Sequence, residues 1–179
     1  MFDINTIKLL RLGGNVERFH TARLICSQNV AQHSFNAALI AHHIATSFID
    51  NGGHECGVNP DKIAMHMLLH DISEQATGDI PSYAKKNYPK FKELLDEAER
   101  DWANENLPLE FSSLYDKDNF NVIENIICKF ADQYDCALTC MEELSMGNSV
   151  MQEVLDRCIS ALEATVNRNP LVLSNVALY

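Results

Sequence analysis

The chain has 179 residues, of which 46% are hydrophobic and 22% charged, a composition typical of one globular domain with a packed core. Its 25 acidic and 14 basic side chains give a net charge of −11. Such a surface repels polyanions and excludes a general DNA- or RNA-binding role. We therefore expect a small-molecule partner, because a few local cations are enough to hold one phosphate ester.

The amino terminus reads MFDINTIKLLRLGG and lacks the long apolar stretch of a signal peptide. No segment approaches the roughly 18 apolar residues of a membrane span. The six cysteines form no CxxC pair, and a chain with a real core needs no disulfide framework, so we expect them to be reduced. These features predict a cytoplasmic protein without a membrane partner, in a bacterium or in a host cell if a phage encodes it.

Apolar residues recur at helical spacing along most of the chain, and the alternation typical of strands is nearly absent. The predicted helices span residues 4–10, about 28–50, 60–72, about 89–106, 121–146 and 149–167. Asn59-Pro60-Asp61 is a helix start, with a cap residue before proline, whereas Asn51-Gly52-Gly53 and Gly147-Asn148 are turns. The sequence therefore predicts an all-α fold, a single compact helical bundle of six or seven helices covering residues 1–179.

The third predicted helix is apolar over most of its surface and ends in His70 and Asp71. Burying an ionised carboxylate beside an imidazole costs several kcal/mol unless both groups are paired or coordinated. A divalent cation would compensate this cost, because it binds neutral imidazole nitrogens and carboxylate oxygens. An HD dipeptide alone is weak evidence, since a capped helix end explains it more simply.

Further candidate ligands lie on two other apolar helices. His33 lies near the start of the second predicted helix, and Asp132 lies within the apolar segment IICKFADQYDCAL. Asp135 shares a helix face with Asp132 and is the alternative ligand. Two histidines and two carboxylates, without cysteine, favour Mn, Co, Fe, Mg or Zn over a closed structural zinc site.

Glu74 lies three residues after the candidate ligand Asp71, on the same side if the helix continues for one more turn. A carboxylate there would stand where a general acid or base acts, although an exposed helix-end glutamate is an equal alternative. The cations on either side of the candidate ligands in the sequence are Arg18, Arg23, Lys85 and Lys86. Each is an ordinary surface charge by default, and this placement makes one or two of them candidate phosphate-binding residues.

Three stretches carry a resemblance to a known family: RFHTARLICSQNVAQHSF, LLHDISEQATGDIPSYAKK and KFADQYDCALTCMEELSMGN. Their H…HD…D pattern resembles that of the HD-domain phosphohydrolases. The SExxTGDxP continuation and the CxEEL-then-GN segment are more restrictive, and they resemble bacterial 5′-deoxynucleotidases, which act on deoxynucleoside monophosphates (dNMPs). The motif-bearing part covers about residues 18–148, and residues 149–179 form a carboxy-terminal helix and tail.

The resemblance implies an HD-domain fold and hydrolysis of the phosphate ester by a water that the metal activates. The implied metal ligands are His33, His70, Asp71 and Asp132, which selects Asp132 over Asp135. Glu74 would be the catalytic carboxylate, and Arg18 would orient the phosphate and stabilise developing charge. The other implied substrate contacts are Phe19, His33, Asp71, Asp79, Ile80, Pro81, Ser82, Lys85 and Asp132. An apolar wall would then favour deoxyribose, because a 2′-hydroxyl would lie unpaired there.

The chain departs from the family pattern at positions that bear on the substrate. Phe19 stands where the family often has tryptophan, His20 where it has proline, and Gln32 where glutamate commonly precedes the first ligand. The segment between Asp71 and Asp132 is also shorter. Compact HD enzymes that hydrolyse deoxynucleoside triphosphates (dNTPs), including dATP, share these ligands. They define the alternative function.

A non-catalytic, nucleotide-binding regulatory module is the alternative from another class, and the complete set of candidate ligands and Glu74 disfavours it. A helical interaction protein with an accidental HD motif is remote, given the three matching stretches. The resemblance also implies a homo-oligomer. The apolar tail LVLSNVALY would be part of its interface or the last strip of the core.

Overall fold

The computed structural model describes residues 4–173, and the regular structure in this range is helical. The α-helices are α1 (Ile4–Leu10), α2 (Val30–Phe48), α3 (Pro60–Leu69), α4 (Glu74–Thr77), α5 (Ser82–Asn87), α6 (Pro89–Asn106), α7 (Leu109–Tyr115), α8 (Val122–Ser145), α9 (Gln152–Arg168) and α10 (Pro170–Leu173). One isolated antiparallel bridge, between Glu17 and Asn29, lies outside any strand. The predicted all-α class is confirmed.

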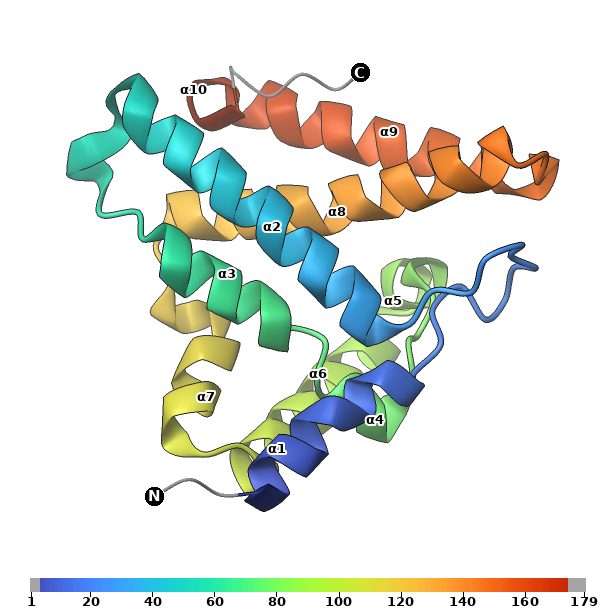
Figure 1. Cartoon of the computed structure of the whole chain (residues 1–179), viewed down its shortest axis with the longest axis horizontal. Helices are drawn as coiled ribbons and strands as arrows, with labels where there is room; N and C mark the ends of the chain where they lie inside the picture. The colour runs from blue at the N-terminus through green and yellow to red at the C-terminus, as the bar shows by residue number, and fades with distance from the viewer. Residues whose placement is uncertain (1–3, 174–179) are drawn as a thin grey trace.

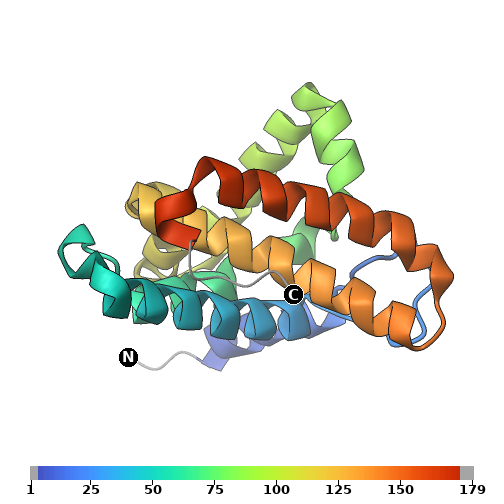
Figure 2. The same cartoon turned by 90° about the horizontal axis from the view of Figure 1, so that it is seen from above.

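The long helices form the body of the fold. α2 packs against α3 on one side and against α8 on another, and α9 runs along α8 (Figure 1). Seen from above, α2, α8 and α9 lie roughly side by side, while α5 and α6 project away from them (Figure 2). The shorter helices α4 to α7 join the end of α3 to the start of α8. The two helices that carry candidate ligands, α2 and α8, therefore cross within the body itself.

A stripe of small residues explains the close packing around α2. Ala37, Ala41 and Ala45 follow one another at intervals of four, and all are fully buried. Their small side chains let the larger Ile63 of α3 and Phe130 of α8 fill the space between the helices. The core thus packs α2 closely against α3 and α8, near the residues that are candidate ligands.

Helix starts agree with the local chemistry of the sequence. Asn59 caps α3 by accepting a hydrogen bond from the backbone N–H of Lys62 at 3.0 Å, and Pro60 occupies the first helical position. Asn29 and Gln32 form a reciprocal capping box at the start of α2. Gly147, with φ of 95°, makes the predicted turn between α8 and α9. Within residues 4–173, no helix is long and apolar enough to cross a membrane.

The prediction of six or seven helices misses short elements, and the third helix was predicted too long. α3 ends at Leu69, and hydrogen bonds from Ile72 N to Leu69 O and from Glu74 N to Asp71 O make tight turns before α4 begins. His70 and Asp71 thus lie in a turn rather than within a helix. The predicted tail is only partly described: Leu171 is exposed and Leu173 is buried in the core, and residues 174–179 lie outside the described range.

Candidate metal centre and active site

Three segments far apart in the sequence bring the candidate ligands together. His33 comes from the first turn of α2, His70 and Asp71 from the turn after α3, and Asp132 from the middle of α8. The Nε2 atom of His70 lies 3.2 Å from Asp71 Oδ2, and Nε2 of His33 lies 3.6 Å from the same oxygen. Asp132 Oδ1 approaches His33 Nε2 to 3.2 Å. The metal-binding atoms of His33, His70 and Asp71 therefore lie close together, and Asp132 adjoins them at His33.

Hydrogen bonds on the far side of each imidazole fix which nitrogen faces that point. His33 Nδ1 donates to the Asp135 carboxylate at 2.7 Å, and His70 Nδ1 donates to the backbone carbonyl of Met67 at 2.7 Å. With Nδ1 donating, an unprotonated ring carries its lone pair on Nε2, which is the form that binds a metal. The two Nε2 atoms are buried and have no hydrogen-bond partner of their own.

This donor set fits a divalent cation. Within residues 4–173, His33, His70 and Asp71 form a group whose donor atoms all lie within 4.8 Å of one another. Ligand atoms that share a cation at about 2.0–2.2 Å stand about 2.8–3.6 Å apart. The observed separations of 3.2 and 3.6 Å fall in this range. A cation would also remove the cost of leaving two imidazole nitrogens buried and unpaired.

The prediction that the Asp132 carboxylate is buried in the apolar segment is wrong, whereas the carboxylate of Asp135 is buried there. The Asp132 side chain is 43% exposed, whereas that of Asp135 is only 3% exposed. Asp135 turns away from the ligand cluster and holds His33, so its carboxylate orients a candidate ligand rather than acting as one. Packing decides which face of α8 is buried, and the apolar sequence around both residues did not reveal it.

The charges of the cluster are strongly coupled. Burial disfavours the ionised form of Asp71, but His70 and Arg18 outweigh it and hold the pKa of Asp71 well below its usual range. Burial likewise opposes protonation of His70, yet the Asp71 carboxylate raises the pKa of His70 to about 9. For His33, the neighbouring carboxylates of Asp132 and Asp135 overcome burial and raise its pKa. A bound cation would take over the positive charge, because it requires unprotonated Nε2 atoms.

Arg18 adjoins the cluster. Its Nη1 atom donates to Asp71 Oδ2 at 3.1 Å and its Nη2 atom to the Cys136 sulfur at 3.1 Å, while Nε has no partner. Burial opposes its charge, but the neighbouring acidic groups raise the pKa of Arg18 above its ordinary value. A permanently charged guanidinium, with donors to spare, therefore stands beside the candidate metal ligands.

Glu74 begins α4 and is buried beside the same cluster. Its Oε2 atom has no partner, and Lys85 Nζ lies 3.5 Å from Oε1. Burial, together with the negative charges of Asp71 and Asp79, raises the pKa of Glu74 to about 9. Such a carboxyl group holds its proton at neutral pH and has the properties of a general acid.

A cavity of about 390 Å³ opens next to Glu74 and includes two of the predicted substrate contacts, Asp79 and Ile80. Its other lining residues are Asn15, Val16, Glu17, His20, Gln75, Thr77 and Gly78. Phe19 lies close by, since its backbone N–H donates to Asp79 Oδ2 at 3.3 Å. Phe19 also has φ of 56°, a left-handed conformation that non-glycine residues hold only where the surroundings enforce it.

Other predicted contacts lie elsewhere or have different neighbours. Lys85, predicted to bind phosphate, pairs with Glu74. Pro81 is half-buried and Ser82 exposed, and neither lines the cavity beside Glu74. The sequence reasoning missed Gln75, whose buried side-chain amide has no partner at either atom and lines that cavity. Gln75 follows Glu74 directly, and its polarity in an otherwise small-residue turn was the only signal.

Comparison with known proteins identifies the family. The family model described as 5′-deoxynucleotidase YfbR-like matches residues 6–173. The chain belongs to the YfbR-like 5′-deoxynucleotidase family. Among curated relatives, the 5′-deoxynucleotidase YfbR of Escherichia coli O127:H6 is 31% identical over 156 residues, which cover 83% of this chain and 77% of the relative.

Solved structures support the fold. An HD-domain phosphohydrolase from Listeria innocua superposes with a TM-score of 0.72 at 21% identity, covering 96% of this chain and 90% of that one. The cyanophage S-2L HD phosphohydrolase DatZ, solved with dA and one catalytic Zn²⁺ ion, gives a TM-score of 0.58 at 20% identity and covers 94% and 99% of the two chains. The chain therefore has the fold of these HD-domain proteins, and its family makes it an enzyme that hydrolyses phosphate esters.

Proposed function

We propose that this enzyme is a metal-dependent 5′-deoxynucleotidase that converts dNMPs to deoxynucleosides and orthophosphate. One observation carries the proposal: two buried, unpartnered Nε2 atoms and the Asp71 carboxylate face one point, with Arg18 and Glu74 beside it. The proposed metal ligands are His33, His70, Asp71 and Asp132. The proposed unit is a single HD domain over residues 1–179, as the family match over 6–173 supports.

The chain's own groups account for the steps around the phosphorus. A divalent cation held by the ligands would lower the pKa of a water ligand and polarise the phosphate. Arg18 would bind phosphate oxygens through its guanidinium N–H groups and stabilise the charge that builds on them. Glu74, whose pKa burial raises, would donate a proton to the departing 5′-oxygen of the nucleoside.

The distribution of cations favours one phosphate group over three. Among the described residues, Arg18 is the cation that pairs with the candidate ligand Asp71. Lys85 is engaged by Glu74, and Arg23 and Lys86 are exposed. A triphosphate needs further positive charge along its length, and of Arg23, Lys85 and Lys86 only Lys85 lies beside the cluster, next to Glu74. The mononucleotide reaction is thus the better match.

The cavity suggests how the sugar is selected. Ile80 contributes apolar surface near Glu74, and a ribose 2′-hydroxyl placed against it would lose its hydrogen bonds to water at a cost of about 1–3 kcal/mol. We therefore expect dNMPs to be preferred over ribonucleotides. The metal identity among Co, Mn, Zn, Mg and Fe, the homo-oligomeric state and the cytoplasmic location stay predictions.

The test is product analysis with a panel of substrates. Purified protein is incubated with each dNMP, ribonucleoside monophosphate and dNTP, and the phosphorus products are separated. We expect orthophosphate from several dNMPs and little from the ribonucleotides. Tripolyphosphate released from one dNTP, with no turnover of dNMPs, would instead show a triphosphohydrolase. Binding of nucleotides without turnover of any would show a regulatory module.

A further inference from the structure

The loop that carries Arg18 has no regular secondary structure of its own. It spans residues 16–29, between the end of the first 3₁₀ turn and α2. At its base, Arg18 N donates to Gln28 O at 2.9 Å and Val30 N donates to Val16 O at 2.9 Å. These bonds close the two ends of the loop and leave its tip, residues 21–26, to be held by something else.

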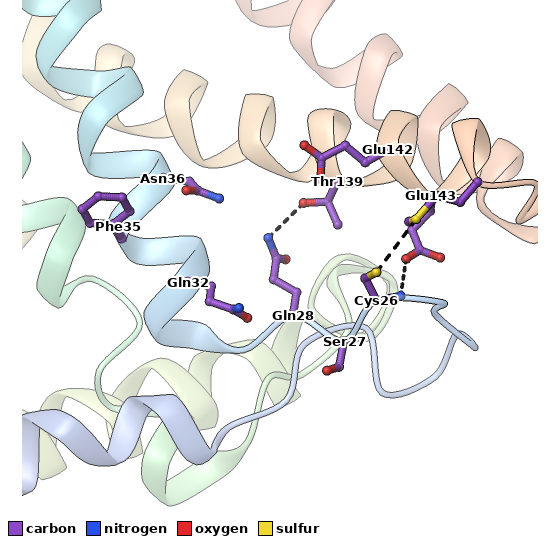
Figure 3. Close-up of a pocket in the computed structure, with 10 residues that line it drawn as sticks. Cys26, Ser27, Gln28, Gln32, Phe35, Asn36, Thr139, Glu142 and Glu143 are labelled. Atoms are coloured by element: carbon purple, nitrogen blue, oxygen red, sulfur yellow. Dashed lines mark hydrogen bonds between the residues drawn. The ribbon is translucent and has the colours of Figure 1, made fainter.

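Two residues at the end of α8 hold the tip. The Glu143 carboxylate accepts hydrogen bonds from Ile25 N and Cys26 N, both at 2.8 Å, and Figure 3 shows the bond from Cys26. Asn148 Nδ2 donates to Glu143 Oε2 at 2.6 Å and to the Arg23 carbonyl at 2.8 Å. Glu143 is 1% exposed, and these three donors lower its pKa. Its carboxylate is therefore ionised, and both of its oxygens accept hydrogen bonds. We call Glu143 and Asn148 the clasp.

The clasp extends a row of buried polar groups along α8. Asp135, Thr139 and Glu143 follow at intervals of four, so they share one face of the helix. Gln28, at the other end of the loop, donates to Thr139 Oγ1 at 2.9 Å and to Asp135 Oδ2 at 3.3 Å. The same helix face therefore orients His33 through Asp135 and holds the Arg18 loop at two further points.

Hydrogen bonds rather than apolar packing fasten the loop here. A cavity of about 300 Å³ lies between the loop, the start of α2 and the end of α8 (Figure 3). Its lining residues are Cys26, Ser27, Gln28, Gln32, Phe35, Asn36, Thr139, Glu142, Glu143 and Met146. Because this space is not filled by side chains, the tip lacks the packing that would keep it in place without the clasp.

We propose that Glu143 and Asn148 are positioning residues that hold the loop closed and thereby set the guanidinium of Arg18 beside Asp71. Both belong to the restrictive CMEELSMGN segment, for which the ligand cluster offers no role. The inference rests on the proposed function in one respect, namely that Arg18 binds phosphate. Displacement of such a group by about 1 Å is enough to cost about 100-fold in rate.

The first measurement asks whether the clasp holds the loop, and it needs no activity. Amide hydrogen exchange is compared in wild type, Glu143→Ala and Asn148→Ala, with Glu142→Ala as the matched control because Glu142 is adjacent and exposed. We expect exchange in residues 19–28 to become at least about tenfold faster in both clasp variants and to stay unchanged in the control. Asn148→Ala keeps the Glu143 carboxylate, so it serves if Glu143→Ala folds poorly.

The second measurement asks whether the clasp acts through Arg18. Affinity of the metal-loaded protein for inorganic phosphate is measured for Glu143→Ala, Arg18→Ala and the double variant. We expect Glu143→Ala to weaken phosphate binding about tenfold in the wild-type background and less than twofold when Arg18 is already absent. A merely structural role would give the same loss in both backgrounds. If dNMPs are substrates, kcat/KM will follow the same pattern.

The outcomes separate the inference from the function on which it rests. Unchanged exchange at residues 19–28 in both clasp variants, or equal losses of phosphate affinity with and without Arg18, would overturn the clasp. Failure of the wild-type enzyme to hydrolyse dNMPs would overturn the proposed function alone, since exchange and phosphate binding still decide the role of Glu143.

Discussion

The strength of the hydrogen bond from His33 to Asp135 determines how far the substitution Asp135→Asn should weaken metal affinity. Asp135→Asn keeps the size of the side chain but removes its charge. The bond is 2.7 Å long and joins side chains that are 0% and 3% exposed, so it is a short, charge-assisted bond out of reach of solvent. A neutral amide in its place makes a bond weaker by about 1–2 kcal/mol. The amide can also donate to Nδ1 and thereby move the imidazole proton to Nε2.

The loss of that bond appears in metal binding. Since 1.4 kcal/mol is about tenfold in an equilibrium constant, we expect a loss of about 1–2 kcal/mol in Asp135→Asn to weaken metal affinity about 5- to 30-fold. Competition with a chelator of known affinity measures this directly. Asp61→Asn is the matched control, because it changes an exposed carboxylate that pairs with His42 at 3.3 Å. Equal metal affinity in Asp135→Asn, Asp61→Asn and wild type would refute the argument that Asp135 prepares His33 for a metal.

Asp71→Ala should abolish both metal retention and hydrolysis, and full turnover by a metal-free variant, checked by elemental analysis, would contradict the site. Glu74→Gln should lower kcat at least about 100-fold while the protein keeps its metal; wild-type kcat would exclude Glu74 from proton transfer. Burial lowers the pKa of His66 to about 4, so the unfolded chain binds a proton that the folded one does not, and stability falls as pH falls below about 6.5. The contribution of His66 should therefore lower the free energy of unfolding by about 2 kcal/mol between pH 7 and pH 5. His66→Gln can still donate to the Leu114 carbonyl, and it should remove this pH-dependent loss of stability, measured by urea unfolding of the metal-free protein. An equal loss of stability in the variant would show that His66 is not responsible.

Local chemistry in the sequence predicted much of the helical framework. The predicted helix 89–106 agrees with α6, Pro89–Asn106, and the start predicted from Asn59 and Pro60 agrees with the cap of α3. These features depend on residues close in the sequence, whose effect on the backbone is largely independent of the rest of the fold. The short helices α4, α5 and α7 were not predicted, because their four to seven residues lack the apolar spacing that marks the equally short α1 at Ile4, Ile7 and Leu10.

The candidate site divides in the same way. Residue type and spacing pointed to His33, His70 and Asp71, which the structure brings together. The respective places of Asp132 and Asp135 depend on the rotation of α8 in the core, which packing decides. The contacts of Glu143 with Ile25 and Cys26 join residues more than one hundred positions apart, so no local sequence pattern predicts them. Long-range hydrogen bonds of a loop are set only once the helices are assembled.

We expect hydrolysis to depend on a metal held by the His-His-Asp cluster. The most direct test is orthophosphate release from dNMPs by chelator-stripped protein, before and after one divalent metal at a time is added. We expect no release from the stripped protein and recovery with at least one of Co, Mn, Zn, Mg or Fe. Full activity of the stripped protein, with no change on adding any metal, would contradict it.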